Sequence, residues 1–440
     1  MEAKEAKQGL RKNFFTVVLL AIAGSIIYGL AYFRNYYYDA YIVTYHLTNT
    51  QMGSLGSAYG FMGLISYLIG GILADRFPAK KLMVGSLIAT GLGGFLHLFF
   101  TSYVALFLIY ALWGVTSLLT FWPALLKIVR MQADEDEQSR AYGIFEGARG
   151  ITNVIHMAVA TAIFGFFQKQ LTETAGLRWI IIFYSVMPIL CGLAFLFLVK
   201  EPTPTEKIVE GQKLQIKDIV DVIKMPAIWI IIGMMFTSYV FNMSIYYFTP
   251  YASNIIGTSA VFAAIVTVLA QYCRLVAAPV GGFLADKISK STVMMGGFIV
   301  MGLGTVLMIS VAGMNGQIQL VLLIIAASIV YLAMFSNYGL FFSFMSEGKI
   351  PLRLSGVAIG LASTLGYLPE VIAPLVAGNV LDKYEGNSGY FIYFSLMIAM
   401  AVIGAILCIV WRRTYGKAYK EEMSLKAIEQ ATHSQLEEME

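Results

Sequence analysis

The sequence predicts an all-α membrane protein with twelve transmembrane helices in two pseudo-symmetric six-helix bundles. Hydrophobic residues make up 58% of the 440 residues and charged residues only 13%, which is too little charge to cover a soluble surface of this size. Residues 70–76 (GGILADR) return as residues 281–287 (GGFLADK), an offset of 286 − 75 = 211 residues. A polar loop repeated at about half the chain length indicates two related halves.

Twelve apolar runs account for nearly the whole chain, and each is long enough to cross a hydrocarbon core of about 30 Å as a helix. We expect these helices at residues 14–33, 51–74, 82–100, 103–126, 141–167, 177–199, 226–250, 257–284, 291–313, 318–345, 353–380 and 388–411. The expected units are a tail (1–13), two bundles (14–199 and 226–411), a linker (200–225) and a second tail (412–440).

The distribution of basic residues predicts the orientation of the chain. With the N-terminus inside, 24 of the 30 Lys and Arg residues lie in cytoplasmic segments. This excess places both termini in the cytoplasm and predicts a multi-pass protein of the plasma membrane, which is the inner membrane in a bacterium. The net charge of +4 therefore reflects topology, and we expect membrane lipid but no nucleic acid as a partner.

Three arginines and two glutamates fall inside the apolar runs, where a charge costs at least about 2.5 kcal/mol and marks a candidate functional site. Arg149 lies about 13 Å into its helix and Arg274 about 18 Å, both near the midplane. Together with Arg34 they outnumber Glu146 and Glu370 by one positive charge. An anionic solute would neutralise that charge, because arginine presents a planar fork suited to carboxylate, sulfonate or phosphate.

Less specific interpretations of the same residues stay open. Glu146 precedes Arg149 by three residues, so the two can form a simple intrahelical salt pair. Arg34 can extend to the outer interface among its neighbouring tyrosines. Arg274 has no acidic residue within one helical turn and has no equally simple alternative.

The repeated loop, with its basic residues after Asp75, resembles the signature loop of the major facilitator superfamily. Its second copy falls between helices 8 and 9, where the pseudo-symmetry of that superfamily requires it. The resemblance implies alternating access between two bundles, with the loops controlling the conformational change. Glycine lets helices approach closely, and an aspartate can pair with a basic group or a helix N-terminus. The conformational candidates are Gly71, Asp75, Arg76, Gly282, Asp286 and Lys287.

Shorter stretches resemble the organophosphate:phosphate antiporter family within that superfamily. The motif in helix 4 of that family resembles Trp122-Pro123, and its motif in helix 5 resembles the segment from Arg140 to Arg149. Its motifs in helices 1 and 11 resemble Arg34 with its neighbours and the segment from Gly366. The chain also departs from the family. Asn242 stands where the family has a second substrate arginine, Arg149 replaces a histidine, Asn35 replaces a lysine and Gln271 replaces an acid. The positive charge of the site is moved to other positions rather than lost. An anionic substrate is therefore still expected, whereas exchange against phosphate is in doubt.

The sequence thus predicts a secondary transporter of a small organic anion such as a sugar phosphate, sugar acid, sulfonated sugar or carboxylate. Coupling is either exchange against another anion or proton symport through Glu146 or Glu370. The candidate substrate-binding residues are Arg34, Tyr38, Arg149, Asn242, Gln271, Arg274 and Tyr367. We expect a monomer without cofactor, metal site or catalytic residue, and no nucleotide-binding loop for ATP-driven pumping appears.

Two alternatives remain open at this point. The first is a proton-coupled carrier of a neutral sugar or nucleoside, in which acidic residues bind the arginines internally. The second is a membrane receptor that keeps the transporter fold but signals to a partner.

Overall fold

The computed structural model describes residues 10–132, 138–199, 216–351 and 354–416, and the regular elements in these ranges are all helical. Ten of the helical segments are long and apolar enough to cross a membrane, or eleven when a bent pair near the N-terminus counts as one span. A further helix, α4, has 28 residues, a length of about 42 Å. These spans confirm the all-helical prediction and agree with twelve transmembrane helices.

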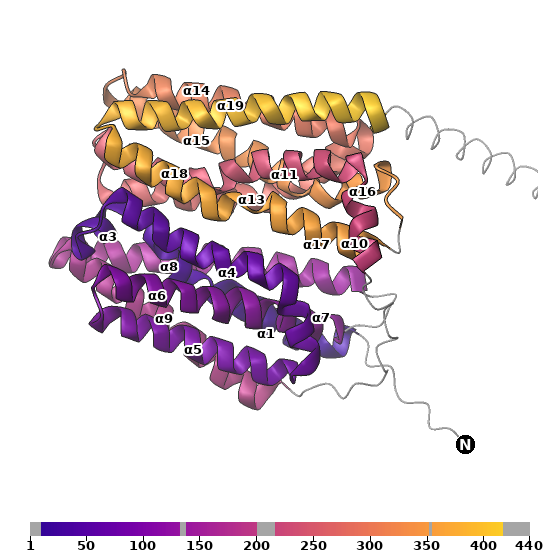
Figure 1. Cartoon of the computed structure of the whole chain (residues 1–440). Helices are drawn as coiled ribbons and strands as arrows, with labels where there is room; N and C mark the ends of the chain where they lie inside the picture. The colour runs from indigo at the N-terminus through magenta and orange to yellow at the C-terminus, as the bar shows by residue number, and fades with distance from the viewer. Residues whose placement is uncertain (1–9, 133–137, 200–215, 352–353, 417–440) are drawn as a thin grey trace, which may run out of the picture.

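The helices form two bundles that lie side by side, the N-terminal one in indigo to magenta and the C-terminal one in pink to yellow (Figure 1). The N-terminal half contains α1 (Leu10–Ile26), α2 (Gly29–Tyr36), α3 (Tyr38–Tyr45), α4 (Asn49–Arg76), α5 (Ala79–Phe99), α6 (Tyr103–Gly114), a π-helical segment (Val115–Phe121), α7 (Trp122–Arg130), α8 (Gln138–Gln170) and α9 (Glu173–Leu198).

The C-terminal half continues with α10 (Ile216–Ile223), α11 (Pro226–Ser244), a short 3-10 turn (Ile245–Tyr247), α12 (Phe248–Asn254), α13 (Ala260–Lys287), α14 (Lys290–Val311), α15 (Gly316–Tyr338), a second 3-10 turn (Phe341–Ser343), α16 (Phe344–Glu347), α17 (Ser355–Gly366), α18 (Pro369–Lys383), α19 (Asn387–Trp411) and a final π-helical segment (Arg412–Gly416).

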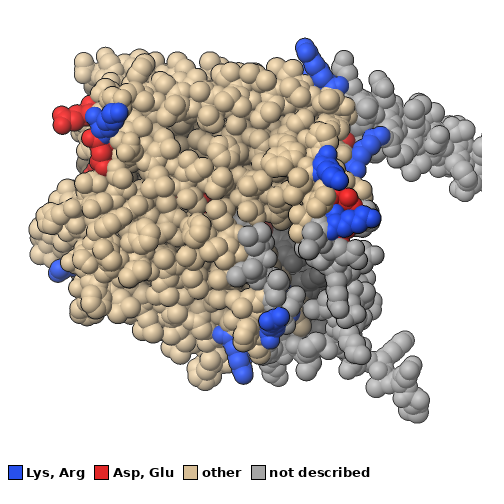
Figure 2. Space-filling model, viewed as in Figure 1, with Lys and Arg blue, Asp and Glu red and all other residues tan. Residues whose placement is uncertain are grey.

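Charged side chains gather at the two ends of the molecule (Figure 2). The broad band between the ends is almost entirely uncharged on the face shown, as a lipid-facing surface requires. Helices α7, α10 and α16 mark one end and α3 marks the other (Figure 1). The basic residues of the sequence make the first of these the cytoplasmic end and the second the outer end.

Several spans are interrupted, whereas the sequence predicted continuous helices. The first span bends by 48° between α1 and α2. Gly29 occupies this bend because a Cβ there would lie 2.2 Å from a ring carbon of Tyr184. The eleventh span is interrupted between α17 and α18, where Pro369 lacks the amide proton that a continuing helix needs. Helix α1 also begins at Leu10, inside the predicted tail 1–13.

The two halves meet mainly where α4 packs against α18 and where α8 packs against α13. The first contact is close because α4 presents glycines to α18. A Cβ on Gly53 would lie 2.1 Å from the carbonyl oxygen of Pro374, and one on Gly60 would lie 2.7 Å from Cγ of Glu370. Small residues of this kind let transmembrane helices pack closely.

Candidate functional site

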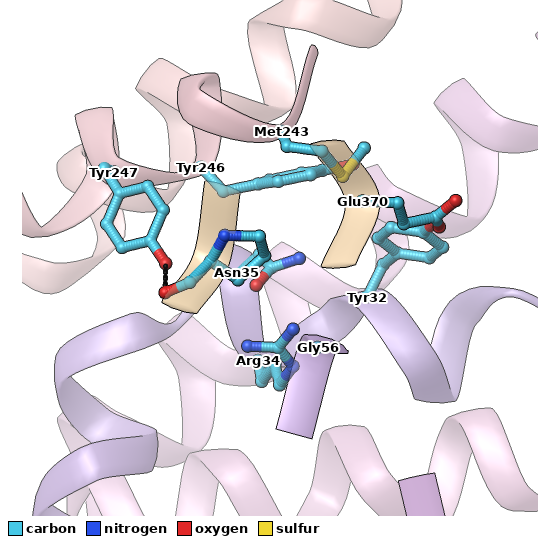
Figure 3. A pocket seen from close by; sticks show the side chains of 9 residues that line it. Tyr32, Arg34, Asn35, Gly56, Met243, Tyr246, Tyr247 and Glu370 are labelled. Atoms are coloured by element: carbon cyan, nitrogen blue, oxygen red, sulfur yellow. Dashed lines mark hydrogen bonds between the residues drawn. The ribbon is translucent and has the colours of Figure 1, made fainter. Parts of the chain in front are cut away.

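A small cavity lies between the two halves, where the end of α2 in the first span meets the start of α18 in the eleventh (Figure 3). Its volume is about 20 Å³, which holds about one water molecule. An organic solute therefore needs the halves to separate before it can bind here. The cavity is lined by Tyr32, Arg34, Asn35, Gly56, Met243, Tyr246, Tyr247, Glu370 and Pro374.

Arg34 is the cation of this cavity. It is 6% exposed, so the expected alternative of extension to the outer interface does not describe this structure. Nη1 donates a hydrogen bond to the carbonyl of Met52 at 3.1 Å, and the guanidinium lies 5.2 Å from the ring centroid of Tyr110. These partners are neutral. Nε is buried and has no hydrogen-bond partner among the described residues.

Gly56 of α4 creates the space that Arg34 occupies. A Cβ at this position would lie 2.3 Å from Nη2 of Arg34. The guanidinium therefore lies against bare helix backbone, and any larger residue at position 56 has to displace it.

Glu370 is the acid of the same cavity and is 7% exposed. Tyr32 from the N-terminal half donates to Oε1 at 2.8 Å, and Tyr239 from the C-terminal half donates to Oε2 at 3.5 Å. The interruption before α18 places Glu370 in the first turn of that helix, where the helix dipole favours negative charge. In Figure 3 Glu370 and Tyr32 lie at one side of the cavity and Arg34 at another.

A group of aromatic rings joins Glu370 to Arg274 within the C-terminal half. The ring of Tyr239 lies 4.6 Å from that of Tyr367, and Tyr367 stacks on Tyr338 at 6.3 Å. The guanidinium of Arg274 lies 5.8 Å from the Tyr338 ring and 5.6 Å from Phe335. Two predicted site residues, Tyr367 and Arg274, thus belong to one aromatic cluster that reaches the cavity through Tyr239.

Arg149 lies in a different environment from Arg34. It forms an ion pair with Glu146 at 2.7 Å, so the predicted intrahelical pair is present. Its Nε donates to the carbonyl of Gly24 at 3.2 Å, close to the bend after α1, and its guanidinium lies 4.8 Å from the Trp122 ring. Within the N-terminal half, Arg149 therefore has an ion-pair partner, a backbone acceptor and an aromatic contact.

The remaining predicted substrate residues lie around this centre. Gln271 of α13 donates to the hydroxyl of Tyr36 at 3.5 Å, across the two halves. Asn242 is half-buried on α11. Tyr38 donates to Asn49 at 2.8 Å and belongs to the outer end rather than to the cavity. None of these three residues lines the cavity that contains Arg34.

Two carboxylates join the halves at the outer end. Asp382 of α18 accepts hydrogen bonds from the backbone amides of Asn49 and Thr50 at 2.8 and 2.7 Å. Asp39 of α3 accepts from Ser253 and from Asn254, the latter at 2.9 Å. Burial raises the pKa of the Asp39 carboxyl above its ordinary value of 3.8, while the two donors oppose that rise. The outer end is therefore closed by contacts between the halves.

The signature loops lie at the cytoplasmic end. Arg76 ends α4 and is exposed, and Lys287 ends α13 with its ammonium 4.3 Å from the Phe283 ring centroid. The side chains of Gly71, Asp75 and Asp286 lie outside the described residues. In the second copy the close approach is made by Gly281, where a Cβ would lie 2.8 Å from Cα of Ser336, while the space beside Gly282 is open.

Sequence reasoning missed most of the residues that line the cavity and the glycines of α4 that pack beside it. Gly53, Gly56 and Gly60 recur at helical spacing on one face of α4, and that pattern was a usable signal of close helix packing. Tyr32, Met243, Tyr246 and Tyr247 had no comparable signal, because aromatic and apolar residues are frequent throughout such helices. Asn35 was noted only as a departure from the antiporter family.

Comparison with known proteins agrees with this architecture. Residues 14–374 match the Major Facilitator Superfamily. The inner membrane protein YihN of Escherichia coli K12 is 29% identical over 424 residues, covering 95% of this chain and 99% of YihN. The probable galactarate/D-glucarate transporter GudP of the same organism is 24% identical over 445 residues, covering 92% of this chain and 95% of GudP.

A solved structure shares the fold at low sequence identity. A bacterial homologue of the human lysosomal transporter Spinster, in an inward-facing and occupied conformation, superposes with a TM-score of 0.74 at 15% identity. The match covers 92% of this chain and 98% of that one. The superfamily match spans most of the chain, and the two-bundle fold agrees with it. The chain therefore belongs to the Major Facilitator Superfamily and is a membrane transporter rather than an enzyme.

Proposed function

We propose that this protein is a secondary active transporter of a small hydroxylated organic anion, such as a sugar acid, and that it works as a monomer. The observation that carries this proposal is Arg34. A buried guanidinium with neutral contacts and an unpaired Nε needs an anionic partner to offset the cost of its burial. A bound carboxylate supplies that partner.

The other cavity residues suit the hydroxyl groups of such a solute. Asn35 offers an amide, and Tyr246 and Tyr247 offer hydroxyl-bearing rings on the opposite wall. Binding sites for small molecules combine apolar and aromatic walls with a few polar groups that fix orientation. Arg34 and the tyrosines come from different halves, so the solute would bridge the two bundles.

Transport would proceed by alternating access. The structure has its outer end closed by Asp39 and Asp382, and its cavity is too small for an organic solute. Separation of the halves at one end at a time would enlarge the cavity and expose Arg34 to that side. The contacts of α4 with α18 would open and close in this cycle.

The relatives favour a carboxylate over a phosphate. GudP is described as a probable transporter of galactarate and D-glucarate, which are sugar dicarboxylates, and it matches 92% of this chain. The organophosphate antiporter resemblance stays a prediction, and its departures at Asn242, Asn35 and Gln271 weaken it. A neutral-sugar carrier needs its arginines bound internally, which describes Arg149 but not Arg34.

Thermal unfolding of the purified protein tests this proposal. The ligands are D-glucarate, galactarate, D-gluconate, glucose 6-phosphate, a sulfonated glucose, D-glucose and uridine. A bound ligand at a hundredfold excess over Kd stabilises the protein by about 2.7 kcal/mol. We expect stabilisation by the sugar acids. Stabilisation by the neutral solutes alone would contradict the proposal and indicate a neutral substrate.

A further inference from the structure

One carboxyl group lies where the two halves meet, at the centre of the eleventh span. Glu370 is 7% exposed and accepts hydrogen bonds from Tyr32 of the N-terminal half and Tyr239 of the C-terminal half. Each half therefore supplies one hydroxyl to the same carboxyl group. Separation of the halves must break one of these bonds, so the surroundings of Glu370 change in every transport cycle.

The groups that face Glu370 are mostly neutral. Tyr28 and Tyr32 come from the first span, Tyr239 and Tyr246 from α11 and the turn that follows it. Helix α4 contributes Gly60 and Gly63, and its Tyr59 packs against Tyr32. The cation on the cavity wall is Arg34, which forms no described ion pair with Glu370.

The charges of Arg34 and Glu370 determine what the cavity accepts. With Glu370 ionised, the two side chains have a formal net charge of zero. An anion that binds Arg34 then leaves excess negative charge in a buried site, which is costly at low dielectric. Protonation of Glu370 removes that excess for a monoanion and reduces it by one charge for a dicarboxylate. The anion and the proton therefore favour each other's binding.

Both protonation states of Glu370 have support in the structure. Burial among apolar and aromatic groups favours the neutral carboxyl. The first turn of α18 and the two tyrosine hydroxyls favour the carboxylate once the site is hydrated. A group that couples proton movement to transport has to bind and release its proton as the site opens and closes. The opposing effects of burial and of these hydrogen bonds allow Glu370 to do so.

We propose that Glu370 carries the coupling proton, so that the protein takes up one proton with its organic anion and works as a symporter. Glu146 does not have this role, because it is 52% exposed and paired with Arg149. This inference rests on the proposed function, since it assumes that the anion binds at Arg34.

Proton uptake on binding gives the direct test. D-Glucarate is added to purified protein in weakly buffered solution, and the pH change is recorded. Coupled binding takes up about one proton per bound anion in the wild type. Glu370→Gln, which keeps the shape of the side chain, should abolish that uptake, while Glu146→Gln and the surface variant Glu173→Gln should retain it.

Proteoliposomes give the second readout. An inward proton gradient should drive accumulation of radiolabelled D-glucarate by the wild type. Glu370→Gln should lose this accumulation and still exchange internal for external D-glucarate, because exchange needs no net proton movement. Active exchange also shows that the variant is folded.

The outcomes separate the two proposals. Exchange without proton uptake or gradient-driven accumulation in the wild type would overturn the role of Glu370 and leave anion transport intact. Loss of coupling in Glu146→Gln instead of Glu370→Gln would also overturn it. A wild type that neither binds nor exchanges any of the three sugar acids would overturn the proposed function, and this inference with it.

Discussion

At the scale of single residues, Arg34 and Arg149 have opposite surroundings, and Arg34 is buried whereas Arg149 is partly exposed. Arg149 is satisfied by Glu146, the Gly24 carbonyl and the Trp122 ring. Arg34 has one backbone carbonyl, one aromatic ring and an unpaired Nε. In the sequence these two arginines look alike, and only their neighbours in the structure distinguish a structural arginine from a candidate binding residue.

Replacement of Arg34 tests that distinction. Arg34→Gln removes the charge and keeps a polar side chain, so stabilisation by D-glucarate should fall to the level seen with D-glucose. The loss of one charge-assisted hydrogen bond corresponds to about 1.5–3 kcal/mol of binding free energy. Thermal unfolding with and without ligand measures it. Arg178→Gln at the exposed start of α9 is the matched control and should bind as the wild type does.

Replacement of Glu146 should have a small effect. Its carboxylate is half exposed, and pairs of this kind contribute about 0–1 kcal/mol. Arg149 also keeps its hydrogen bond to the Gly24 carbonyl and its contact with Trp122. We therefore expect Glu146→Gln to lower the unfolding free energy by less than about 1 kcal/mol. A larger loss, or a loss of transport, would mean that Arg149 depends on this partner.

At the scale of helices, α4 and α18 control the distance between the halves. Gly53 lies directly against the Pro374 carbonyl, whereas Gly85 in α5 has no atom within 4 Å of its Cβ position. Gly53→Ala should therefore destabilise the closed outer end by about 1–3 kcal/mol, as overpacking does. Gly85→Ala should stabilise the protein by about 0.5–1 kcal/mol through helix propensity. Melting temperatures of the two variants check both signs.

The sequence predicted the helices better than their interruptions and contacts. Long apolar runs determine the spans, because lipid leaves no partner for unpaired backbone groups. Pro369 and Gly29 mark two of the interruptions, but prolines and glycines also occur inside continuous membrane helices such as α9, which contains Pro188. The pairing of Gly53 with Pro374 joins positions 321 residues apart (374 − 53), and no local pattern encodes it.

The candidate site was predicted in part. Charge inside an apolar run identified Arg34 and Glu370 as candidates, because such residues are costly in the membrane. The structure places both on the wall of one cavity, while Tyr38 lies at the outer end and Arg149 is paired elsewhere. Their use by a substrate stays a prediction. Tyr32, which links the halves through Glu370, could not be distinguished from the many other tyrosines of the chain.

At the scale of the whole molecule, the outer end should close more firmly as the pH falls. The pKa of Asp39 is raised by burial in the closed form and returns toward 3.8 when the carboxyl becomes hydrated. The closed form therefore binds the proton of Asp39 more tightly than the open form does. Lowering the pH toward the pKa of Asp39 favours the closed form, and raising the pH favours opening. Asp39→Asn keeps the hydrogen-bond acceptor and should remove this dependence.

Distance measurement between spin labels checks this prediction. Labels at the exposed positions Val43 and Tyr384 lie at the outer ends of the two halves. The population of long distances should grow with pH in the wild type and stay constant in Asp39→Asn. A matched change at Asp382, such as Asp382→Asn, should leave the pH dependence in place. Growth of long distances as the pH falls toward 3.8 would contradict the assignment to Asp39.

The central claim is that the protein moves an organic anion bound at Arg34, and counterflow tests it most directly. Proteoliposomes loaded with unlabelled D-glucarate, galactarate or D-gluconate are diluted into the labelled form of the same anion. We expect transient accumulation of at least one label by the wild type and none by Arg34→Gln, with Arg178→Gln equal to the wild type. Equal accumulation by Arg34→Gln would contradict the site, and ligand binding without accumulation in the wild type would indicate a receptor instead of a transporter.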